Sequence, residues 1–317
     1  MTSVDTRPAQ AAPLVTIGMP VYNGAATIRR ALDSLVAQDY PAIEIVIADD
    51  VSRDATAAIC DEYAARYPHI SVRRNPTNLG AYGNFSHLLL QAKGPYFVWA
   101  SQDDWWDPRF VSALMTRLTQ NPHAVAALSG VRYFTDDPAV GPISRLSGAD
   151  NPERQTRRGA LKALMTKQGS KGGAVRSNMY IHGVVRTDSF RESVLALDGP
   201  FLNERQLIFQ WLLVGPLLYV DEVLMAKMTH ESSVHATDPY VVNRQRPLFA
   251  LRYAAGLVGA AWRSHDIAPG KRPLALWAAW YYLRARTVVN AVRFIQRTFP
   301  HAIAAARRIA GRPKKNA

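Results

Sequence analysis

Two adjacent carboxylates, Asp103 and Asp104, follow an apolar run at residues 96–100 and precede two tryptophans and a proline. The run predicts a buried strand, and Pro108 suits the first turn of a helix. Acids at the end of a buried strand are costly to desolvate unless a cation or hydrogen-bond donors meet them. In an open α/β sheet, this edge is also where ligands bind. The pair therefore indicates a ligand or cation site, with an exposed turn or a helix cap as the alternative.

Two earlier apolar runs end in similar polar loops. Residues 14–20 lead into Tyr22 and Asn23, and residues 43–48 lead into Asp49 and Asp50. Because the carboxyl ends of parallel strands share one edge of a sheet, we expect these side chains to converge with Asp103 and Asp104. If Asp103 and Asp104 only formed a turn, this would not explain why polar loops follow all three strands at the same edge.

The elements that position these loops alternate between strand and helix along the chain. Periodicity predicts strands at residues 14–20, 43–48, 70–74, 96–100, 124–133, 178–185, 217–220 and 223–228. It predicts helices at residues 25–38, 54–67, 81–92, 109–119, 187–197 and 204–214. Alternation on short loops favours an α/β fold with a mostly parallel sheet covered by helices on both faces. The long segment 135–175 is weakly periodic and reads as a functional or mobile loop.

Composition limits the class of protein. The 317 residues are 48% hydrophobic, enough for a sizeable core and too many for general disorder. Cys60 is the single cysteine, so no intramolecular disulfide forms, which favours a reducing, cytoplasmic compartment. The N-terminus lacks the apolar region of a signal peptide, and no apolar run is long enough to span a bilayer.

Most of the net charge of +13 lies in the tail. Residues 241–317 hold 15 Lys or Arg and one acid, Asp266, so the first 240 residues are close to neutral. The tail reads as helical, with arginines interleaved among aromatic residues, a pattern that suits an anionic membrane surface. Nucleic-acid binding and a merely solvated tail are the alternatives; no recognised nucleic-acid module accompanies the charge, so we expect no nucleic acid. We predict three parts: a flexible leader (1–13), a catalytic domain (14–240) and this tail (241–317).

The order of motifs resembles glycosyltransferase family 2, inverting nucleotide-sugar enzymes with the GT-A fold. Residues 14–23 are similar to the family's opening strand and Pro-x-Tyr-Asn loop. Residues 48–56 resemble its Asp-Asp-Gly-Ser-Thr-Asp-x-Thr segment, with Val51 in place of the glycine. Residues 75–84 are similar to its Asn-x-Gly segment, and residues 101–108 to its Asp-x-Asp-Asp metal motif, with Ser101 in place of the first acid.

The resemblance implies a nucleotide site and a divalent cation. Asp49 or Asp50 would contact the base or ribose, and one of them could instead cap the helix that starts near Asp54. The other expected nucleotide-binding residues are Pro20, Tyr22, Asn23, Arg74, Asn78, Gly80 and Asp103, although Pro20 could only shape the loop and Arg74 could be an exposed edge-strand arginine. Mg²⁺ or Mn²⁺ would bind Asp103, Asp104 and His230, with diphosphate oxygens completing its shell.

An inverting transfer also needs a base for the acceptor hydroxyl. The resemblance places it at Glu204, where the alternative is an acid favoured by the helix macrodipole. We therefore expect a metal-dependent glycosyltransferase at the inner face of the cell membrane. It would use a UDP, dTDP or GDP sugar and a lipid-linked or polysaccharide glycan acceptor. A non-catalytic nucleotide-sugar-binding protein, suggested by Ser101, and a nucleotidyltransferase are the alternatives; the loop at 19–24 lacks the basic residue that the latter usually needs.

Overall fold

The computed structural model describes residues 11–145, 153, 156–166, 181–196, 204–229 and 247–284. In this part of the chain, strands form a nine-stranded sheet in the order β3-β2-β1-β4-β8-β6-β9-β5, with β7 paired to β6. The strands are β1 (Val15–Val21), β2 (Ile43–Asp49), β3 (Ile70–Arg74), β4 (Tyr96–Trp99), β5 (Trp105–Trp106), β6 (Ala126–Phe134), β7 (Ile143–Ser144), β8 (Val184–Arg186) and β9 (Leu217–Met228). The helices are α1 (Ile28–Val36), α2 (Thr56–Arg66), α3 (Gly80–Gln91), α4 (Phe110–Gln120), α5 (Arg157–Thr166), α7 (Thr187–Ala196), α8 (Glu204–Val214) and α10 (Pro247–Arg263).

The sheet is mostly parallel. Strands β3, β2, β1 and β4 run parallel, and α1, α2 and α3 connect them in the chain as in βαβ units. Strand β6 pairs parallel with β9. The short strand β8 lies between β4 and β6 and is antiparallel to both. The strands of the two parallel groups therefore all run in the same direction. The carboxyl ends of β1, β2 and β3 consequently lie at one edge. This arrangement confirms the expected α/β class.

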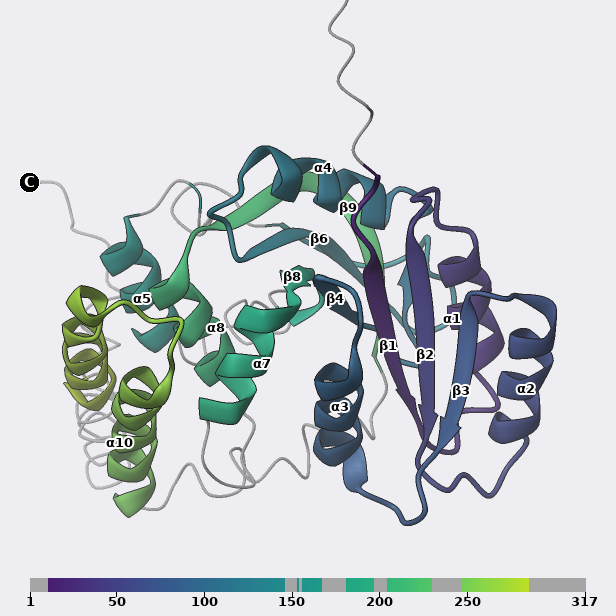
Figure 1. The fold of residues 1–317 in the computed structure, drawn as a ribbon, viewed down its shortest axis with the longest axis horizontal. Helices are drawn as coiled ribbons and strands as arrows, with labels where there is room; N and C mark the ends of the chain where they lie inside the picture. Colours follow the sequence, from purple (N-terminus) through teal and green to yellow (C-terminus); the bar gives the residue numbers. More distant parts are fainter. Residues whose placement is uncertain are drawn as a thin grey trace, which may run out of the picture.

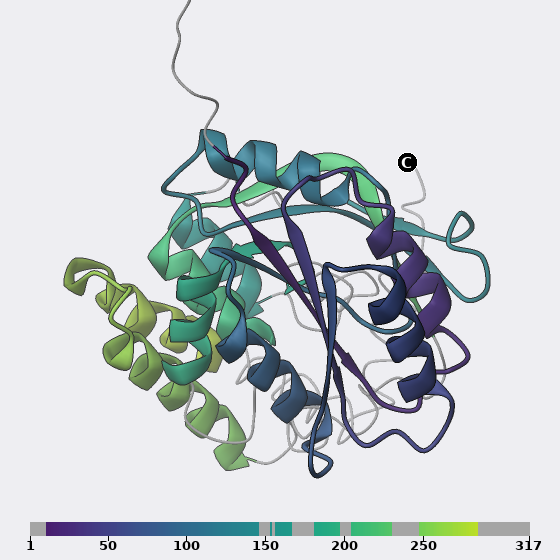
Figure 2. The same cartoon turned by 45° about the vertical axis from the view of Figure 1, so that its right-hand side comes forward.

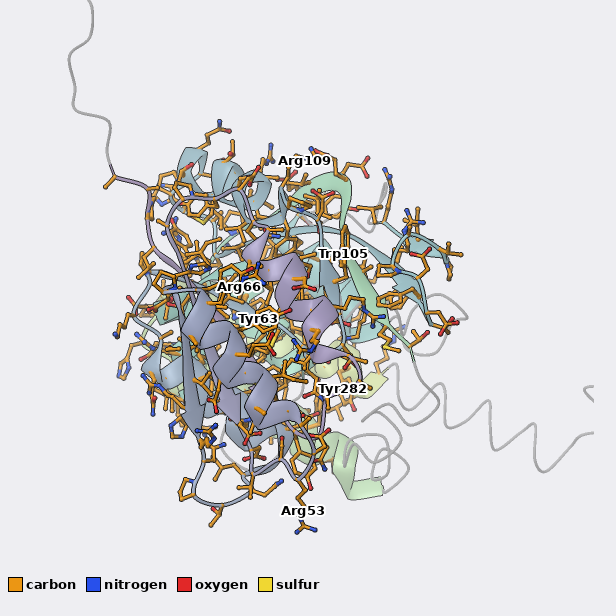
Figure 3. All side chains as sticks on the ribbon, turned by 90° about the vertical axis from the view of Figure 1, so that its right-hand side faces the viewer. Arg53, Tyr63, Arg66, Trp105, Arg109 and Tyr282 are labelled. Atoms are coloured by element: carbon orange, nitrogen blue, oxygen red, sulfur yellow. The ribbon has the colours of Figure 1, made fainter. Side chains whose placement is uncertain are left out.

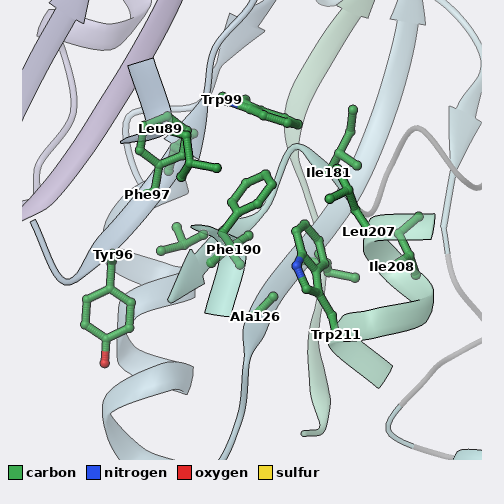
Figure 4. Close-up of a cluster of buried hydrophobic side chains, with 14 of the residues drawn as sticks. Leu89, Tyr96, Phe97, Trp99, Ala126, Ile181, Phe190, Leu207, Ile208 and Trp211 are labelled. Carbon is green, nitrogen blue, oxygen red and sulfur yellow. The ribbon is translucent and has the colours of Figure 1, made fainter. Parts of the chain in front are cut away.

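Helices cover both faces of the sheet. Figure 1 shows α1 and α2 on one side of β1–β3 and α3, α7 and α8 on the other, and the turned view in Figure 2 shows the same layers. Between β4 and the second helical layer lies an aromatic cluster, drawn in Figure 4, in which Trp99 packs on Phe190 with ring centroids 4.4 Å apart. Phe190 in turn contacts Trp211 of α8 at 4.8 Å. Edge-to-face packing of these large rings holds α7 and α8 against the sheet.

Four strands and one helix differ from the prediction. Strand β7 and helix α5 lie within residues 135–175, which we expected to be a loop. Residues 217–220 and 223–228 form one strand, β9, and its register against β6 shifts near Ser129 and Gly130, which absorbs the polar residues between the two apolar runs. Strand β8 is limited to Val184–Arg186. The tryptophans at 105 and 106 form a short strand, because they pair with Ala226 and Met225 of β9. Long-range pairing of this kind leaves no local periodic signal.

The described part of the basic tail is helical, and its helix α10 packs against α7 and α8. Helix α10 and the helical segment 273–284 bury Tyr253, Leu257 and Tyr282 in the same hydrophobic core as the sheet. Lys271 donates to the carbonyl of Val214 at the end of α8. No helix in the described residues combines the length and apolarity needed to cross a bilayer. The leader 1–10, most of residues 146–180 and residues 285–317 lie outside the described part, so the expectations placed there are not examined by it.

Candidate active site

The loops that follow β1, β2 and β3 each contain one residue in the left-handed conformation. These residues are Asn23 (φ 48°), Val51 (φ 66°) and Gly80 (φ 71°). Glycine and asparagine adopt this region readily, whereas a β-branched residue does so only under strain. Strain of this kind persists where surrounding contacts enforce it, and it concentrates at functional sites. The backbone at Val51 therefore keeps the shape of a glycine turn while carrying a valine.

Asp50 holds two of these loops together. Its Oδ1 accepts hydrogen bonds from Asn75 Nδ2 (2.8 Å) and the Leu79 amide (2.8 Å), and its Oδ2 accepts one from the Gly80 amide (2.9 Å). Asn78 donates to the Asp50 carbonyl, and Gly80 also donates to the side chain of Asn78. Asp50 is 2% exposed, so its carboxylate is fully used inside the protein. We conclude that Asp50, Asn78 and the Gly80 amide shape the start of α3.

Asp49 is buried to a similar degree but has far fewer partners. It is 3% exposed, and the hydrogen bonds that its carboxylate accepts come from a single group, the Ser52 amide, at 3.3 and 3.4 Å. A buried carboxylate ordinarily accepts several hydrogen bonds, because each unsatisfied oxygen costs free energy. Asp49 therefore keeps acceptor capacity at the edge of the sheet. The expected helix cap comes from another residue, Asp54, whose Oδ1 accepts from the Thr56 amide at 3.0 Å.

The loop after β1 is joined to the loop after β4 by Gln102. The Gln102 side chain accepts from the Tyr22 amide (2.9 Å) and donates to the Tyr22 carbonyl (3.1 Å). The loops come so close at Gly24 that any side chain there would overlap the Gln102 amide. Tyr22 itself is 45% exposed, so its ring is available to a ligand. These contacts bring the Tyr22 loop and the acidic loop together.

Asn23 joins the loops after β1 and β2. Its amide donates to Ser52 Oγ (3.0 Å), and its side-chain oxygen accepts from the Arg53 amide (2.8 Å). The Arg53 side chain projects outward from this end of the molecule (Figure 3). Asn23 therefore links the loop after β1 to the loop after β2 through hydrogen bonds.

Asp103 lies half-buried in the acidic loop, and Arg30 of α1 holds its backbone. The Arg30 guanidinium donates to the Asp103 carbonyl (3.2 Å) and packs on the ring of Phe134, 4.8 Å from its centroid. It also contacts the sulfur of Met228. The ends of β4, β6 and β9 are thereby tied to α1.

Asp104 is not the exposed turn considered from the sequence. It is 1% exposed, and its Oδ1 accepts from the Met228 amide at 3.0 Å. Burial raises the pKa of Asp104 to about 7, against the effects of Lys227, the Met228 amide and the Ser101 hydroxyl, which lower it. Ser101, which stands at the first acid position of the motif, lies close enough to favour the charged form of this carboxylate. Asp107, rather than Asp104, accepts from the Arg109 amide (2.9 Å) just before α4, and the N-cap residue of α4 makes no side-chain cap hydrogen bond.

Lys227 and His182 complete the surroundings of Asp104, and sequence reasoning did not single them out. The Lys227 ammonium lies 3.9 Å from Asp104 Oδ2 and 2.9 Å from His182 Nε2. Lys227 is in register with Tyr133 on the neighbouring strand β6. A sequence signal exists, since each residue interrupts an apolar stretch near the end of a strand.

Glu204 begins α8, as expected, and electrostatics relate it to the acidic loop. The pKa of Tyr133 is raised by burial first and then by the charges of Glu204 and Asp104. Both carboxylates therefore lie within electrostatic reach of the Tyr133 hydroxyl. The fold brings together two acids that are 100 residues apart in the sequence.

Three predicted residues remain: Arg74 and Pro20 lie in strands at this edge of the sheet, with Arg74 in register with Asp49, and His230 is not described. Arg74 is exposed at the edge strand β3 and pairs with Asp61 of α2. Pro20 belongs to β1, in register with Ala48 of β2. His230 lies outside the described residues.

The described residues fit a divalent cation only with help from a ligand. Within them, no group of three or more His, Cys, Asp or Glu is placed to hold a metal ion. Asp104 is engaged by the Met228 amide and Lys227, and the neighbouring Asp103 is the more exposed of the two carboxylates that a cation could meet. Mg²⁺ and Mn²⁺ can bind through one or two carboxylates when substrate phosphates supply the other ligands. The donor set therefore fits a metal that arrives with a diphosphate.

Comparison with known sequences identifies the family. The family described as Glycosyl transferase family 2 matches residues 16–182, more than half of the chain. An uncharacterized protein of Mycobacterium tuberculosis is 40% identical over 123 residues, which are 37% of this chain and 35% of the relative. An uncharacterized glycosyltransferase of Rickettsia typhi is 38% identical over 96 residues, 30% of this chain and 29% of the relative. The matches span about a third of the length of these curated relatives.

Solved structures share the fold. Staphylococcus aureus TarS 1–349 in complex with UDP-GlcNAc superposes with a TM-score of 0.56 at 16% identity, covering 88% of this chain and 91% of that one. The mannosyltransferase PcManGT from Pyrobaculum calidifontis, in complex with GDP-Man and Mn²⁺, superposes with a TM-score of 0.51 at 18% identity, covering 96% and 84%. The fold is GT-A, as the motif order indicated. On the family match, this chain belongs to glycosyl transferase family 2.

Proposed function

We propose that this protein is an inverting glycosyltransferase, which moves a sugar from a nucleoside diphosphate donor to a hydroxyl of a glycan acceptor. One observation carries the proposal: the loops after β1, β2 and β4, which hold Tyr22, Asp49 and Asp103, are joined at one edge of the sheet by hydrogen bonds of Asn23 and Gln102. This edge would hold the donor, and Glu204 at the start of α8 would serve the acceptor. The structural relatives with UDP-GlcNAc and GDP-Man support the donor class.

The donor nucleotide would lie at the ends of β1 and β2. Asp49 has acceptor capacity for a base N–H or a ribose hydroxyl, and the exposed ring of Tyr22 can stack on the base. Asp50, Asn78 and Gly80 would act indirectly by holding the loops. Arg74, paired with Asp61, would reach the diphosphate only by giving up that ion pair.

In the transfer step, the acceptor hydroxyl attacks the anomeric carbon as Glu204 takes its proton. A new bond forms between the acceptor oxygen and the anomeric carbon, and the bond to the phosphate oxygen breaks. The electron pair leaves with the nucleoside diphosphate, and attack from the opposite side inverts the anomeric configuration. Mg²⁺ or Mn²⁺, held through Asp103 and also by Asp104 and His230 if these turn toward it, would neutralise the leaving diphosphate.

The experiment that tests this function is a donor screen. The full chain is incubated with UDP-, dTDP- and GDP-sugars and Mn²⁺, and release of the nucleoside diphosphate is measured. We expect hydrolysis of at least one donor and its loss in Asp103→Asn. A chain that binds nucleotide identically with and without Mn²⁺, and releases none, would instead be the non-catalytic binding protein, which the engagement of Asp104 by Lys227 favours as the second candidate.

We further propose that the basic tail attaches the protein to the cytoplasmic face of the cell membrane, where a lipid-linked acceptor would lie. The described part exposes four large apolar side chains, Leu251, Trp262, Leu276 and Trp280. Arg284 lies 5.3 Å from the Trp280 ring centroid, a pairing of cation and aromatic ring suited to lipid headgroups.

The membrane proposal has its own test. Leu276→Ser combined with Trp280→Ser should weaken binding to vesicles that contain phosphatidylglycerol, measured by co-sedimentation. Val140→Ser, at an exposed apolar residue remote from the tail in sequence, is the control. Equal binding by both variants would contradict the proposal. Truncation at residue 271 is unsuitable, because residues 273–284 contribute to the core.

A further inference from the structure

Lys227 is a cation near the proposed site, and it follows an apolar, buried stretch of β9. Its neighbours along β9, Leu224, Met225 and Ala226, are at most 1% exposed, whereas the Lys227 side chain is 21% exposed. A charged side chain in such a position needs a partner or a function, because burial of an uncompensated charge is costly. Its two described partners are His182 and Asp104.

These partners do not use the ammonium fully. A lysine carries three N–H donors and no acceptor, so at the 2.9 Å contact His182 Nε2 accepts one of them. The distance of 3.9 Å to Asp104 Oδ2 permits charge pairing but is too long for a hydrogen bond. Asp104 Oδ2 itself has no hydrogen-bond partner among the described residues. At least one N–H of Lys227 therefore remains available to a ligand in the part of the site that is described.

The charges at this edge show what kind of ligand that would be. Asp103 and Asp104 together would cancel the charge of a divalent cation and leave nothing for a diphosphate. Lys227 offsets Asp104, so that a cation held at Asp103 keeps one net positive charge toward the donor. The guanidinium of Arg30 donates to backbone carbonyls and packs on Phe134, and its unpaired Nε is buried. Lys227 is thus a partly exposed cation that can meet an anion, among the residues that the structure describes.

We propose that Lys227 binds the diphosphate of the donor, donating a hydrogen bond to a phosphate oxygen while it offsets the charge of Asp104. This inference rests on the proposed function. It assigns to Lys227 a part of the positive charge that meets the diphosphate, which a metal ion would otherwise supply alone. It follows that a nucleoside diphosphate binds even without a divalent cation, and that loss of Lys227 is felt most under that condition.

The test is calorimetric titration of the full chain with UDP, dTDP and GDP, in Mn²⁺ and in EDTA. For the nucleotide that binds, Lys227→Met should weaken affinity in EDTA by about 10- to 100-fold, as expected for loss of a charge-assisted hydrogen bond. Lys93→Met is the matched control, because Lys93 is exposed and lies three residues before the start of β4, at the opposite end of that strand from Asp103. Lys227→Arg should retain part of the affinity, since it keeps the charge.

Two further measurements separate binding from a structural role. The affinity for the unphosphorylated nucleoside, followed by NMR titration, should be the same in Lys227→Met and the wild type. The double variant Asp104→Asn, Lys227→Met removes both charges and so avoids a lone buried carboxylate. It should be as weak for the diphosphate as Lys227→Met.

The outcomes are distinct. If Lys227→Met binds the diphosphate as Lys93→Met does, or if the double variant recovers wild-type affinity, the inference is overturned while the proposed function stands. If Lys227→Met weakens nucleoside and diphosphate equally, Lys227 has only a structural role and the inference also falls. If the wild type binds none of UDP, dTDP and GDP in any condition, the proposed donor class fails and takes this inference with it.

Discussion

Asp49 and Asp50 are adjacent, equally buried and chemically identical, and the structure predicts opposite consequences for their replacement by asparagine. Asp50 accepts three hydrogen bonds from the loop that starts α3, whereas Asp49 accepts only from the Ser52 amide, at long distance. We expect Asp50→Asn to lower stability and Asp49→Asn to lower nucleotide affinity.

The magnitudes follow from the contacts. In Asp50→Asn an NH₂ group would replace one carboxylate oxygen. It would face either the Gly80 amide or the two groups that donate to Oδ1, which are all hydrogen-bond donors. At least one hydrogen bond is therefore lost, and two donors are left facing each other. Loss of a buried charged acceptor with such opposition costs about 3 kcal/mol. For a chain of 317 residues, that lowers Tm by about 4 to 5 °C. Asp49→Asn loses one weak bond, so its cost stays below about 1 kcal/mol.

The assay pairs thermal unfolding with calorimetric titration of the nucleoside diphosphate. Asp49→Asn should retain a Tm close to wild type while its affinity for the nucleotide falls about 10-fold or more. In Asp50→Asn, the Tm should fall strongly and the affinity for the nucleotide should change less. The reasoning is refuted if Asp49→Asn melts as low as Asp50→Asn, or if Asp50→Asn abolishes nucleotide binding without any loss of Tm.

Three other changes give independent checks. Val51→Gly should raise the free energy of unfolding by about 0.5 to 1 kcal/mol, since relief of a strained φ exceeds the entropic cost of glycine; urea denaturation that shows a loss of stability would contradict this. Because the folded pKa of Asp104, about 7, lies above its ordinary value, the stability it contributes is present at low pH and is lost as pH rises toward 7 and beyond. Asp104→Asn should therefore gain stability relative to wild type between pH 5 and pH 8 in EDTA, and a constant difference between the two unfolding free energies would refute the raised pKa. Glu204→Gln should lower turnover by about 100-fold or more with little change in donor affinity, whereas Glu62→Gln, on the exposed surface of α2, should leave turnover unchanged; equal turnover in both variants would remove Glu204 as the base.

Local pattern in the sequence determined the class of fold and the edge of the sheet that carries the site. Apolar runs followed by Asn23, Asp49 and Asp103 are readable because each strand and its exit loop are contiguous in the chain. Parallel pairing then places those loops together. The start of α8 at Glu204 was likewise readable from its apolar period.

Only the tertiary structure decided what each acid does. Neighbouring aspartates receive different partners from segments 25 to 124 residues away, so Asp50 is saturated, Asp49 is not, and Asp104 is enclosed by Met228 and Lys227. Lys227 and His182 entered the site in the same way, through strands that meet only after the sheet has formed. Whether a carboxylate is free to bind a ligand depends on burial and on donors brought from far along the chain, and no local pattern contains that information.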